Sequence, residues 1–214
     1  MAIMGEYFKI RGLGGKKILS GGISVNGAKN AALKVLAASF LFKDKVLLEN
    51  VPLIEDIKRM CELLGELGMN VWQGIKGSYT IEPSGKIATE LPEGLSQKFR
   101  ASIVLAGPIL ARYGRVSFFF PGGCLIGKRP VDFFIEGFEK MGARVRVSAH
   151  GASIKYLIET KSGKLNGREI FLRAPSVTAT ETFILAGALA SGETVVKNAA
   201  MEPEIVSLVN YLSA

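Results

Sequence analysis

The segment from Pro121 to Pro130 has the clearest potential for chemistry in this sequence. It holds three glycines, the thiol of Cys124 and two neighbouring cations, Lys128 and Arg129. Nearby positive charge lowers the pKa of a thiol and favours the reactive thiolate, and an arginine can bind a phosphate or carboxylate through two hydrogen bonds. Because loops of this kind usually lie at the surface, we interpret Cys124 as a reactive thiol. The alternative is a small buried thiol in a tight turn.

A second candidate is the segment from Gly27 to Leu33, which opens an apolar helix. The first N–H groups of a helix have no partner within the helix, and the helix dipole favours an anion beside them. Lys29 adds a full positive charge, and Asn30 adds a donor and an acceptor. This combination suits a phosphate or a sugar hydroxyl. The alternative is an ordinary helix start with a solvated lysine.

Two further polar segments precede apolar helices. The segment from Pro175 to Thr182 offers serine and threonine side chains as N-caps, and we expect Glu181 in the first turn of the helix that follows. Arg100 precedes another apolar helix and has the character of a surface cation. If the fold brings these helix starts into one cleft, Arg100 could join Lys29 and Arg129 around one anionic ligand.

The remaining chemistry-bearing residues point to structural roles. Cys61 lies on the apolar face of a predicted helix and is expected to be a core residue. Two cysteines are too few for a disulfide framework. Only His150 could join them around a metal, and no pair of ligands has metal-binding spacing. We therefore expect no metal site.

The chain is basic, with 27 lysines and arginines against 19 acids and a net charge of +8. Such an excess suits anionic partners, including nucleic acids, phosphates and nucleotides. The charges form no long basic run, and the aromatic run Phe118 to Phe120 is typical of a buried strand. A nucleic-acid partner is therefore not expected.

The elements that position these segments repeat along the chain. The same order of helix, strand, turn and second helix starts at Leu36, Leu105 and Leu185. The first two copies continue with a glycine cap and an extended segment. The predicted strands span 46–48, 116–120 and 194–196, and the predicted second helices span 57–67 and 131–141 and begin at Pro203. The caps are Gly68 and Gly142, and Gly114 and Gly192 are expected to end the preceding helices of the second and third copies.

Similar units that mix strands and helices predict an α/β domain, with the more apolar helices inside. The third copy reaches Ala214 before its expected cap and closing strands, so we expect a truncated third repeat. No apolar run has the length of a membrane helix, and the first twelve residues do not resemble a secretory signal. These features favour a cytoplasmic protein without membrane insertion.

Taken together, these segments resemble the UDP-N-acetylglucosamine 1-carboxyvinyltransferase family. The resemblance runs along nearly the whole chain and rests on 27–33, 121–132 and 198–206. It implies an inside-out α/β barrel domain of three βαβαββ-type repeats, the third truncated. By the same resemblance, residues 1–25 would belong to a second domain absent from this chain. Residues 26–214 would form the domain that bears the catalytic loop, incomplete at its C-terminus.

The resemblance also implies a reaction. The family transfers the enolpyruvyl group of phosphoenolpyruvate to the 3′-hydroxyl of UDP-N-acetylglucosamine, the first committed step of peptidoglycan synthesis, with no cofactor. Cys124 would be the thiol that fosfomycin alkylates. This chain, as a fragment, is expected to be inactive alone. One alternative is an enzyme similar to 5-enolpyruvylshikimate-3-phosphate synthase, which lacks the Pro-Gly-Gly-Cys loop. Another is a non-catalytic fragment that binds nucleotide sugars.

By the same resemblance, the catalytic residues would be Cys124, Lys29 and Arg129. The substrate-binding residues would be Lys29, Asn30, Arg100, Arg129, Pro130, Val131, Asp132, Phe133, Ser176, Val177 and Thr178. Three residues depart from the family pattern. Lys34 stands where proline is usual, Thr178 where glycine is usual, and Phe134 where a polar residue is usual.

Overall fold

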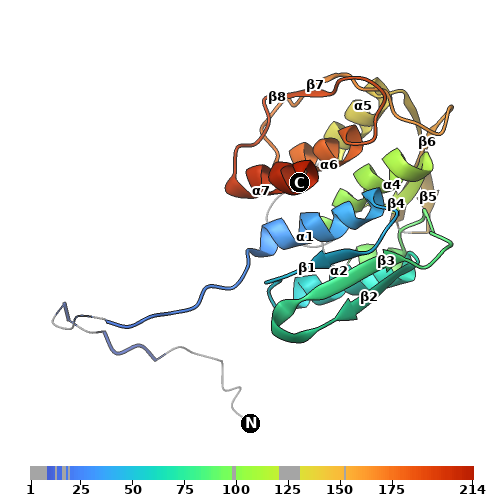
Figure 1. The fold of residues 1–214 in the computed structure, drawn as a ribbon. Helices are drawn as coiled ribbons and strands as arrows, with labels where there is room; N and C mark the ends of the chain where they lie inside the picture. Colours follow the sequence, from blue (N-terminus) through green and yellow to red (C-terminus); the bar gives the residue numbers. More distant parts are fainter. Residues whose placement is uncertain are drawn as a thin grey trace, which may run out of the picture.

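The computed structural model describes residues 9–12, 14, 15, 18, 20–97, 100–120, 131–151 and 153–214 (Figure 1). The first unit contains α1 (Lys29–Ala38), η1 (Ser39–Leu41), β1 (Val46–Leu48), α2 (Glu55–Glu66), β2 (Met69–Gln73), η2 (Ile75–Gly77) and β3 (Tyr79–Pro83). The second contains α3 (Glu93–Ser96), η3 (Arg100–Leu105), α4 (Ala106–Tyr113), β4 (Arg115–Phe119), α5 (Asp132–Lys140), β5 (Ala143–His150) and β6 (Ser153–Thr160). The third contains β7 (Glu169–Phe171), α6 (Val177–Gly187), β8 (Val195–Lys197) and α7 (Pro203–Ser213).

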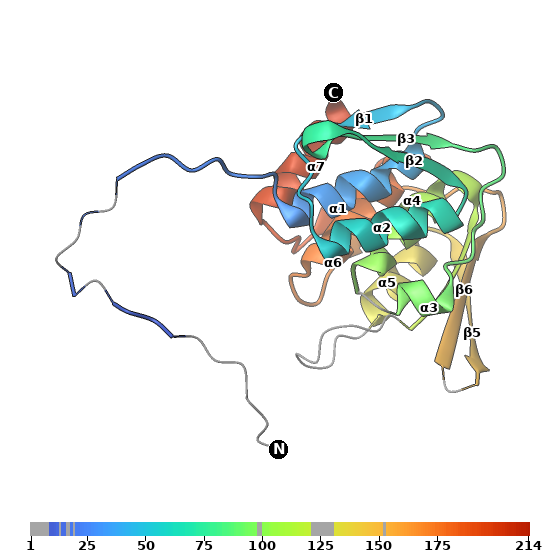
Figure 2. The ribbon, with the colours of Figure 1, turned by 90° about the horizontal axis from the view of Figure 1, so that it is seen from below.

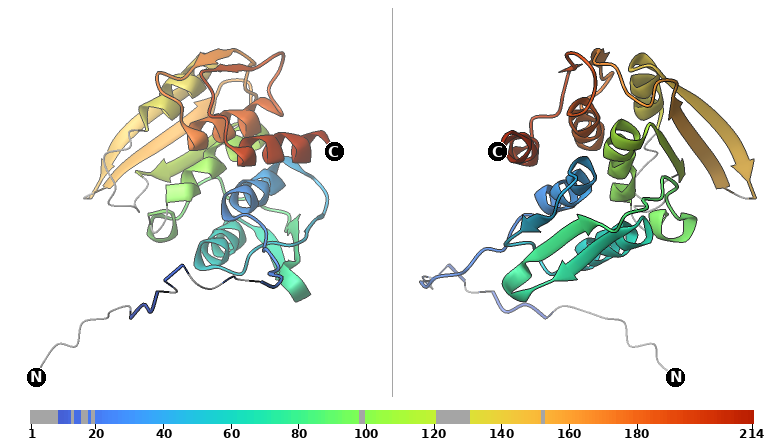
Figure 3. Two further views of the ribbon diagram at one scale, coloured as in Figure 1. Left: turned by 90° about the vertical axis from the view of Figure 1, so that its left-hand side faces the viewer. Right: turned by 45° about the vertical axis from the view of Figure 1, so that its right-hand side comes forward.

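Three helices, α1, α4 and α6, lie in the middle of the domain, and the sheets lie outside them (Figure 3). Every residue of α4 from Ala106 to Ala111 is buried, and α6 is buried almost as completely. A helix that is apolar on nearly all sides must be surrounded by protein. The expectation that the helices lie inside the sheets is therefore confirmed.

The inner helices can pack closely because small residues lie where they cross. A Cβ atom at Gly107 of α4 would collide with the backbone oxygen of Thr182 in α6. A Cβ atom at Gly137 of α5 would collide with the Phe183 ring. The helix α2 packs against α1 and lies next to the first sheet (Figure 2). Glycine at these contacts lets helix backbones approach within the distance that a larger side chain would prevent.

The first two sheets share one topology. Their strand orders are β1-β3-β2 and β4-β6-β5, and every pairing within them is antiparallel. In the third unit, β7 pairs with β8 in parallel. The second unit has a parallel contact of the same kind, an isolated bridge between Glu90 and Ser117. In both units the chain before the inner helix lies beside the strand that follows that helix.

Backbone conformation confirms how the repeats align. Asn50 and Asn198 both have the left-handed conformation, with φ of 56° and 54°, and each follows the first strand after an inner helix. Asparagine tolerates this conformation better than most residues. Gly68 and Gly142 end α2 and α5, each with positive φ and each donating its N–H to a carbonyl three residues earlier. These glycines cap the helices as the sequence predicted.

Three details of the sequence prediction are wrong. The helix α6 ends at Gly187 and not at Gly192, because the chain turns there and the Ser191 N–H donates to the Leu165 carbonyl oxygen. Glu181 is not in the first turn of α6 but in its second, where it is fully buried. Phe120 is 40% exposed because it lies just beyond the end of β4.

The residues before α1 lie apart from the packed domain. Ile18, Ile23 and Val25 are almost fully exposed, and residues 20–26 run away from the helices in Figures 1 and 2. The predicted domain boundary after residue 25 stays a prediction. Among the residues that the structure describes, no helix is long and apolar enough to cross a membrane.

Candidate functional site

The start of α1 is open to a ligand. Gly27 leads into it and lies so close to the Asn50 backbone oxygen that any Cβ atom would collide with it. The N-cap residue is Ala28, and no side chain in the described part of the chain caps the first turn. The first N–H groups of α1 therefore have no side-chain cap. Lys29 and Asn30, which the sequence singled out, are both exposed beside them.

Lys29 forms an ion pair with Asp56, from the first turn of α2. Their side chains are 50% and 30% exposed. Exposed pairs of this kind contribute only about 0–1 kcal/mol, because water already solvates both charges well. A phosphate could therefore compete with Asp56 for the Lys29 ammonium group at little cost.

Asn30 is oriented by Glu204, from the first turn of α7. The Asn30 Nδ2 atom donates a hydrogen bond to Glu204 Oε1 at 3.0 Å. Since only the amide nitrogen can donate to a carboxylate, this bond fixes which end of the amide faces Glu204. The amide oxygen Oδ1 is left to accept a hydrogen bond, for example from a hydroxyl group.

The start of α6 joins the same group of helix starts. Ser176 caps α6 by accepting a hydrogen bond from the Ala179 N–H at 3.4 Å. Thr180 Oγ1 accepts one from the Ala200 N–H at 3.0 Å, which ties α6 to the chain just before α7. Ser176, Val177 and Thr178 are half-buried. Contacts from residue to residue thus connect the starts of α2, α1, α7 and α6.

Two other predicted site segments lie on neighbouring elements. Arg100 is half-buried at the start of η3, which packs against both α1 and α6. Val131, Asp132 and Phe133 lie at the start of α5, whose Phe134 packs against Phe183 of α6. Asp132 is exposed, but the Val131 side chain is buried in the core. Val131 as a whole is only 2% exposed, so of these three residues Asp132 is the most open to a ligand.

The remaining predicted site residues, Cys124, Arg129 and Pro130, lie outside the described residues, as does Lys128. Their predicted roles stay predictions. The described chain stops on one side of this segment at Phe120, beyond β4, and resumes at Val131, the N-cap residue of α5.

Sequence reasoning missed the contacts of four charged residues. Asp56 and Glu204 hold Lys29 and Asn30, and both are acids in the first turn of a helix, which is a common position for an acid. Nothing in the sequence shows their partners, since Asn30 and Glu204 are 174 residues apart. The other two are Lys34 and Glu181, whose side chains pair inside the core at 3.2 Å. A charged residue inside an otherwise apolar helix is the sequence feature that could have indicated a buried ion pair.

A pocket of about 370 Å³ borders the start of α1, where Gly27 and Ala28 line it, and continues along the helix. Its lining is mostly apolar and includes Ala31, Val35, Leu47 and Tyr211. Lys29 and Asn30 do not line it. The pocket offers little to hold an anion, so we do not place the candidate site there.

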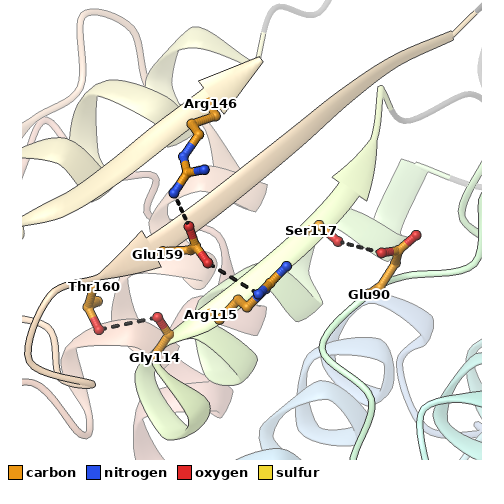
Figure 4. A network of polar contacts seen from close by, with 7 residues as sticks. All are labelled: Glu90, Gly114, Arg115, Ser117, Arg146, Glu159 and Thr160. Carbon is orange, nitrogen blue, oxygen red and sulfur yellow. Dashed lines mark hydrogen bonds and ion pairs between the residues drawn. The ribbon is translucent and has the colours of Figure 1, made fainter. Parts of the chain in front are cut away.

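The polar network in Figure 4 belongs to the second sheet. Glu159 lies between Arg146 and Arg115, at 2.8 Å and 3.3 Å, and these contacts connect all three strands of the sheet. Glu90 accepts hydrogen bonds from Ser117 and Lys155, and the Lys155 ammonium group is the main cause that lowers the pKa of the Glu90 carboxyl. None of these residues was predicted to bind substrate. Their contacts connect neighbouring strands and are sufficiently explained by that role.

The two cysteines are expected to differ in reactivity. Cys61 is half-buried on α2, and burial, with the Glu62 carboxylate as the smaller cause, raises the pKa of its thiol from 9.0 to about 11. A higher pKa leaves less thiolate, although the remaining thiolate is more nucleophilic. The net effect slows alkylation about tenfold relative to an ordinary cysteine.

We therefore expect iodoacetamide to label Cys124 at least about tenfold faster than Cys61 at pH 7.5. Mass spectrometry of the two cysteine peptides after brief labelling measures both rates in one sample. A Cys61→Ser variant provides the control, because it should leave the rate at Cys124 unchanged. Equal labelling of both thiols would contradict the prediction.

The architecture is that of the enolpyruvyl transferases. The structure is similar to that of "the enolpyruvyl transferase NikO from Streptomyces tendae", with a TM-score of 0.74 and 21% identity over 93% of this chain and 45% of that one. It is also similar to EPSP synthase from Acinetobacter baumannii, with a TM-score of 0.68 and 19% identity over 87% of this chain and 42% of that one. At these identities the likeness shows the fold alone, and it confirms the predicted fold class.

Sequence comparison gives the family. The model of the EPSP synthase (3-phosphoshikimate 1-carboxyvinyltransferase) family matches residues 13–214, so the chain belongs to that family. A curated relative from Idiomarina loihiensis, named UDP-N-acetylglucosamine 1-carboxyvinyltransferase, is 44% identical over 98% of this chain and 48% of its own length. Another of that name, from Gloeobacter violaceus, is 43% identical over 90% of this chain and 41% of its own length. The resemblance inferred from the motifs is confirmed, and the chain spans about half the length of the curated relatives it matches.

Proposed function

We propose that the chain is part of an enzyme that transfers the enolpyruvyl group of phosphoenolpyruvate to the 3′-hydroxyl of UDP-N-acetylglucosamine and releases phosphate. The observation that carries the proposal is the uncapped start of α1, where Lys29 and Asn30 offer a cation and an amide oxygen side by side. A phosphate and a sugar hydroxyl are the groups that such a pair would bind. The names of relatives more than 40% identical to this chain give independent support.

In this proposal Lys29 binds the phosphate of phosphoenolpyruvate and stabilises its charge as the phosphate leaves. The Asn30 amide oxygen accepts a hydrogen bond from the sugar, with Glu204 holding the amide in place. The exposed Asp132 and the segment 176–178 contact the nucleotide part of the acceptor substrate, UDP-N-acetylglucosamine. Arg100, carried by an element between α1 and α6, adds a second cation for that substrate's diphosphate.

The reaction then proceeds by addition and elimination. The sugar 3′-oxygen forms a bond to C2 of phosphoenolpyruvate and loses its proton, while C3 gains a proton. In the resulting tetrahedral ketal, C3 gives up a proton again, the double bond re-forms, and the bond from C2 to the phosphate oxygen breaks. Cys124 is proposed to act near C2 and C3, by forming a covalent adduct or as general acid, and to be the thiol that fosfomycin alkylates. Arg129 is the proposed second phosphate ligand.

About half of each curated relative's length lies outside the match. We infer that this part corresponds to a second domain that supplies further catalytic groups, and that the chain alone binds substrate but does not complete the reaction. The step belongs to peptidoglycan synthesis in the cytoplasm and serves cell shape and division.

Ligand titration tests the proposal. Calorimetry with the purified chain is expected to show binding of UDP-N-acetylglucosamine and no binding of shikimate 3-phosphate. The Asn30→Ala variant should bind the nucleotide sugar more weakly, whereas Asn70→Ala, an exposed asparagine on β2, should bind like the wild type.

Other outcomes of the titration are equally informative. Binding of shikimate 3-phosphate would instead support an enzyme similar to EPSP synthase, which the description of the matching family model also suggests. Failure to bind either ligand would contradict the proposal. Phosphate release from phosphoenolpyruvate, measured with both substrates present, separates an enzyme from a fragment that only binds. Turnover by the chain alone would show that no second domain is needed.

A further inference from the structure

Lys34 and Glu181 form an ion pair in the interior of the domain. Lys34 Nζ lies 3.2 Å from Glu181 Oε2, and the two side chains are 7% and 0% exposed. Every other ion pair of the described residues has at least one partner that is more than a quarter exposed. Removing two charges from water is costly, and the attraction between them repays that cost only when the geometry is good. A buried pair of this kind therefore calls for an explanation other than stability.

The surroundings of Glu181 leave Lys34 as its main polar contact. Neither carboxylate oxygen of Glu181 has a hydrogen-bond partner among the described residues. The charged groups that act on it are Lys34 from α1 and, at longer range, Glu204 and Glu202 at the start of α7. The hydroxyl groups beside it on α6 form hydrogen bonds with other residues. Thr180 Oγ1 accepts one from the Ala200 N–H, and Thr182 Oγ1 donates one to the Thr178 carbonyl oxygen. The position of the Glu181 carboxylate thus depends on Lys34.

The pair connects two helices that both begin at the candidate site. Lys34 is the sixth residue of α1 and Glu181 the fifth of α6, so each lies in the second turn of its helix. The first turn of α1 carries Lys29 and Asn30, and the first turn of α6 carries Thr178. Between α1 and α6 lie η3 and α7, each packed against both helices. The lysine side chain reaches across to give a direct link.

We propose that Lys34 and Glu181 are a positioning pair, which fixes the first turn of α1 relative to the first turn of α6 so that both can contact one nucleotide sugar. The proposal rests on the function proposed above, since that function assigns substrate contacts to both turns. Neither Lys34 nor Glu181 touches the substrate, because both are buried.

The link depends on the charge of Glu181. Burial is the main cause that raises the pKa of the Glu181 carboxyl to about 7, and Lys34 opposes that shift. The pair is therefore complete above neutral pH and loses its negative partner below it. The diphosphate of UDP-N-acetylglucosamine stays ionised across this range. Affinity for this ligand is thus expected to rise between pH 6 and pH 8.

The decisive variant is the double substitution Lys34→Met with Glu181→Leu, which removes both charges and keeps the core apolar. We expect it to bind UDP-N-acetylglucosamine about tenfold more weakly than the wild type at pH 8, without the rise between pH 6 and pH 8. Lys197→Met is the matched control, because Lys197 is an ion-paired but exposed lysine on β8. It should keep wild-type affinity and pH dependence.

Hydrogen exchange of the ligand-free protein provides a readout that needs no substrate. In the double variant, peptides that cover 27–33 and 176–182 are expected to exchange faster, while peptides from β4, β5 and β6 exchange as in the wild type. Unchanged exchange in these two turns, or an equal increase throughout the domain, would overturn the positioning role. So would wild-type affinity and pH dependence in the double variant. If the wild type binds no nucleotide sugar, the proposed function fails, and exchange alone then decides the role of the pair.

Discussion

Replacing Glu181 by leucine is expected to lower the free energy of unfolding by about 3–5 kcal/mol, the range found when one partner of a buried ion pair is removed. The substitution leaves the Lys34 ammonium group buried at 7% exposure with its partner gone. Adding Lys34→Met removes that charge as well. The double variant should therefore recover most of the loss and be within about 1 kcal/mol of the wild type, or more stable.

Lys34→Met alone should lower the free energy of unfolding by less than Glu181→Leu alone. Glu181 can accept a proton near neutral pH, because its pKa is already raised to about 7, and a neutral carboxyl costs only about 1–3 kcal/mol to leave without a partner. Urea unfolding followed by circular dichroism at pH 7.5 measures all four proteins. Glu139→Leu, at an exposed position of α5, controls for the new leucine and should change stability by less than about 0.5 kcal/mol. Losses that simply add in the double variant would contradict the prediction.

The raised pKa of Glu181 also predicts how the stability of the wild type depends on pH, and the double variant tests it. A carboxyl whose pKa rises from 4.5 to about 7 on folding binds more protons in the folded state between those pH values. Its contribution to stability is therefore fully present below pH 4.5 and is lost as the pH rises through about 7. The loss is about 3 kcal/mol. The difference in stability between wild type and double variant should shift by that amount over this range, and no shift would show that Glu181 keeps an ordinary pKa.

Replacing Lys29 by alanine is expected to weaken the binding of phosphoenolpyruvate by about 1.5–3 kcal/mol, the range for hydrogen bonds to charged groups. The Lys29 side chain is half exposed, and its partner Asp56 holds it only weakly. Asp56→Asn should therefore not weaken the binding of phosphoenolpyruvate, and could tighten it by freeing the Lys29 ammonium group. Calorimetry gives both affinities. Lys164→Ala, an exposed lysine far along the chain on a loop, is the control and should not change the affinity.

A double variant with Arg129→Ala tests whether Lys29 acts together with the predicted loop. If both cations bind one phosphate, their effects should not add, because groups with a shared partner are coupled. Effects that add within about 0.5 kcal/mol would place Arg129 and Lys29 at independent sites. Wild-type affinity in Lys29→Ala would remove α1 from the phosphate site altogether.

The sequence by itself determined the repeat, the fold class and the helix starts. Apolar residues at helical spacing predicted α2 and α5 to within a few residues, since such a pattern has to bury one face. Gly68 and Gly142 marked the C-terminal ends of helices, because glycine readily adopts positive φ. Pro203 marked a helix start, because its missing N–H is not needed there. Lys29, Asn30 and Ser176 were recognised because capping and anion binding at a helix start depend on a few adjacent residues.

Tertiary structure alone decided which charges meet. Asp56 and Glu204 lie close to predicted helix starts, yet their contacts with Lys29 and Asn30 follow from how α2 and α7 pack around α1. The sequence predicted Glu181 in the first turn of its helix, whereas packing of α6 against α4 and α7 buried it in the second turn and left Lys34 as its partner. Local propensity acts over a turn or two of chain. The partner of a charge, and whether water reaches it, depend on elements far away in sequence.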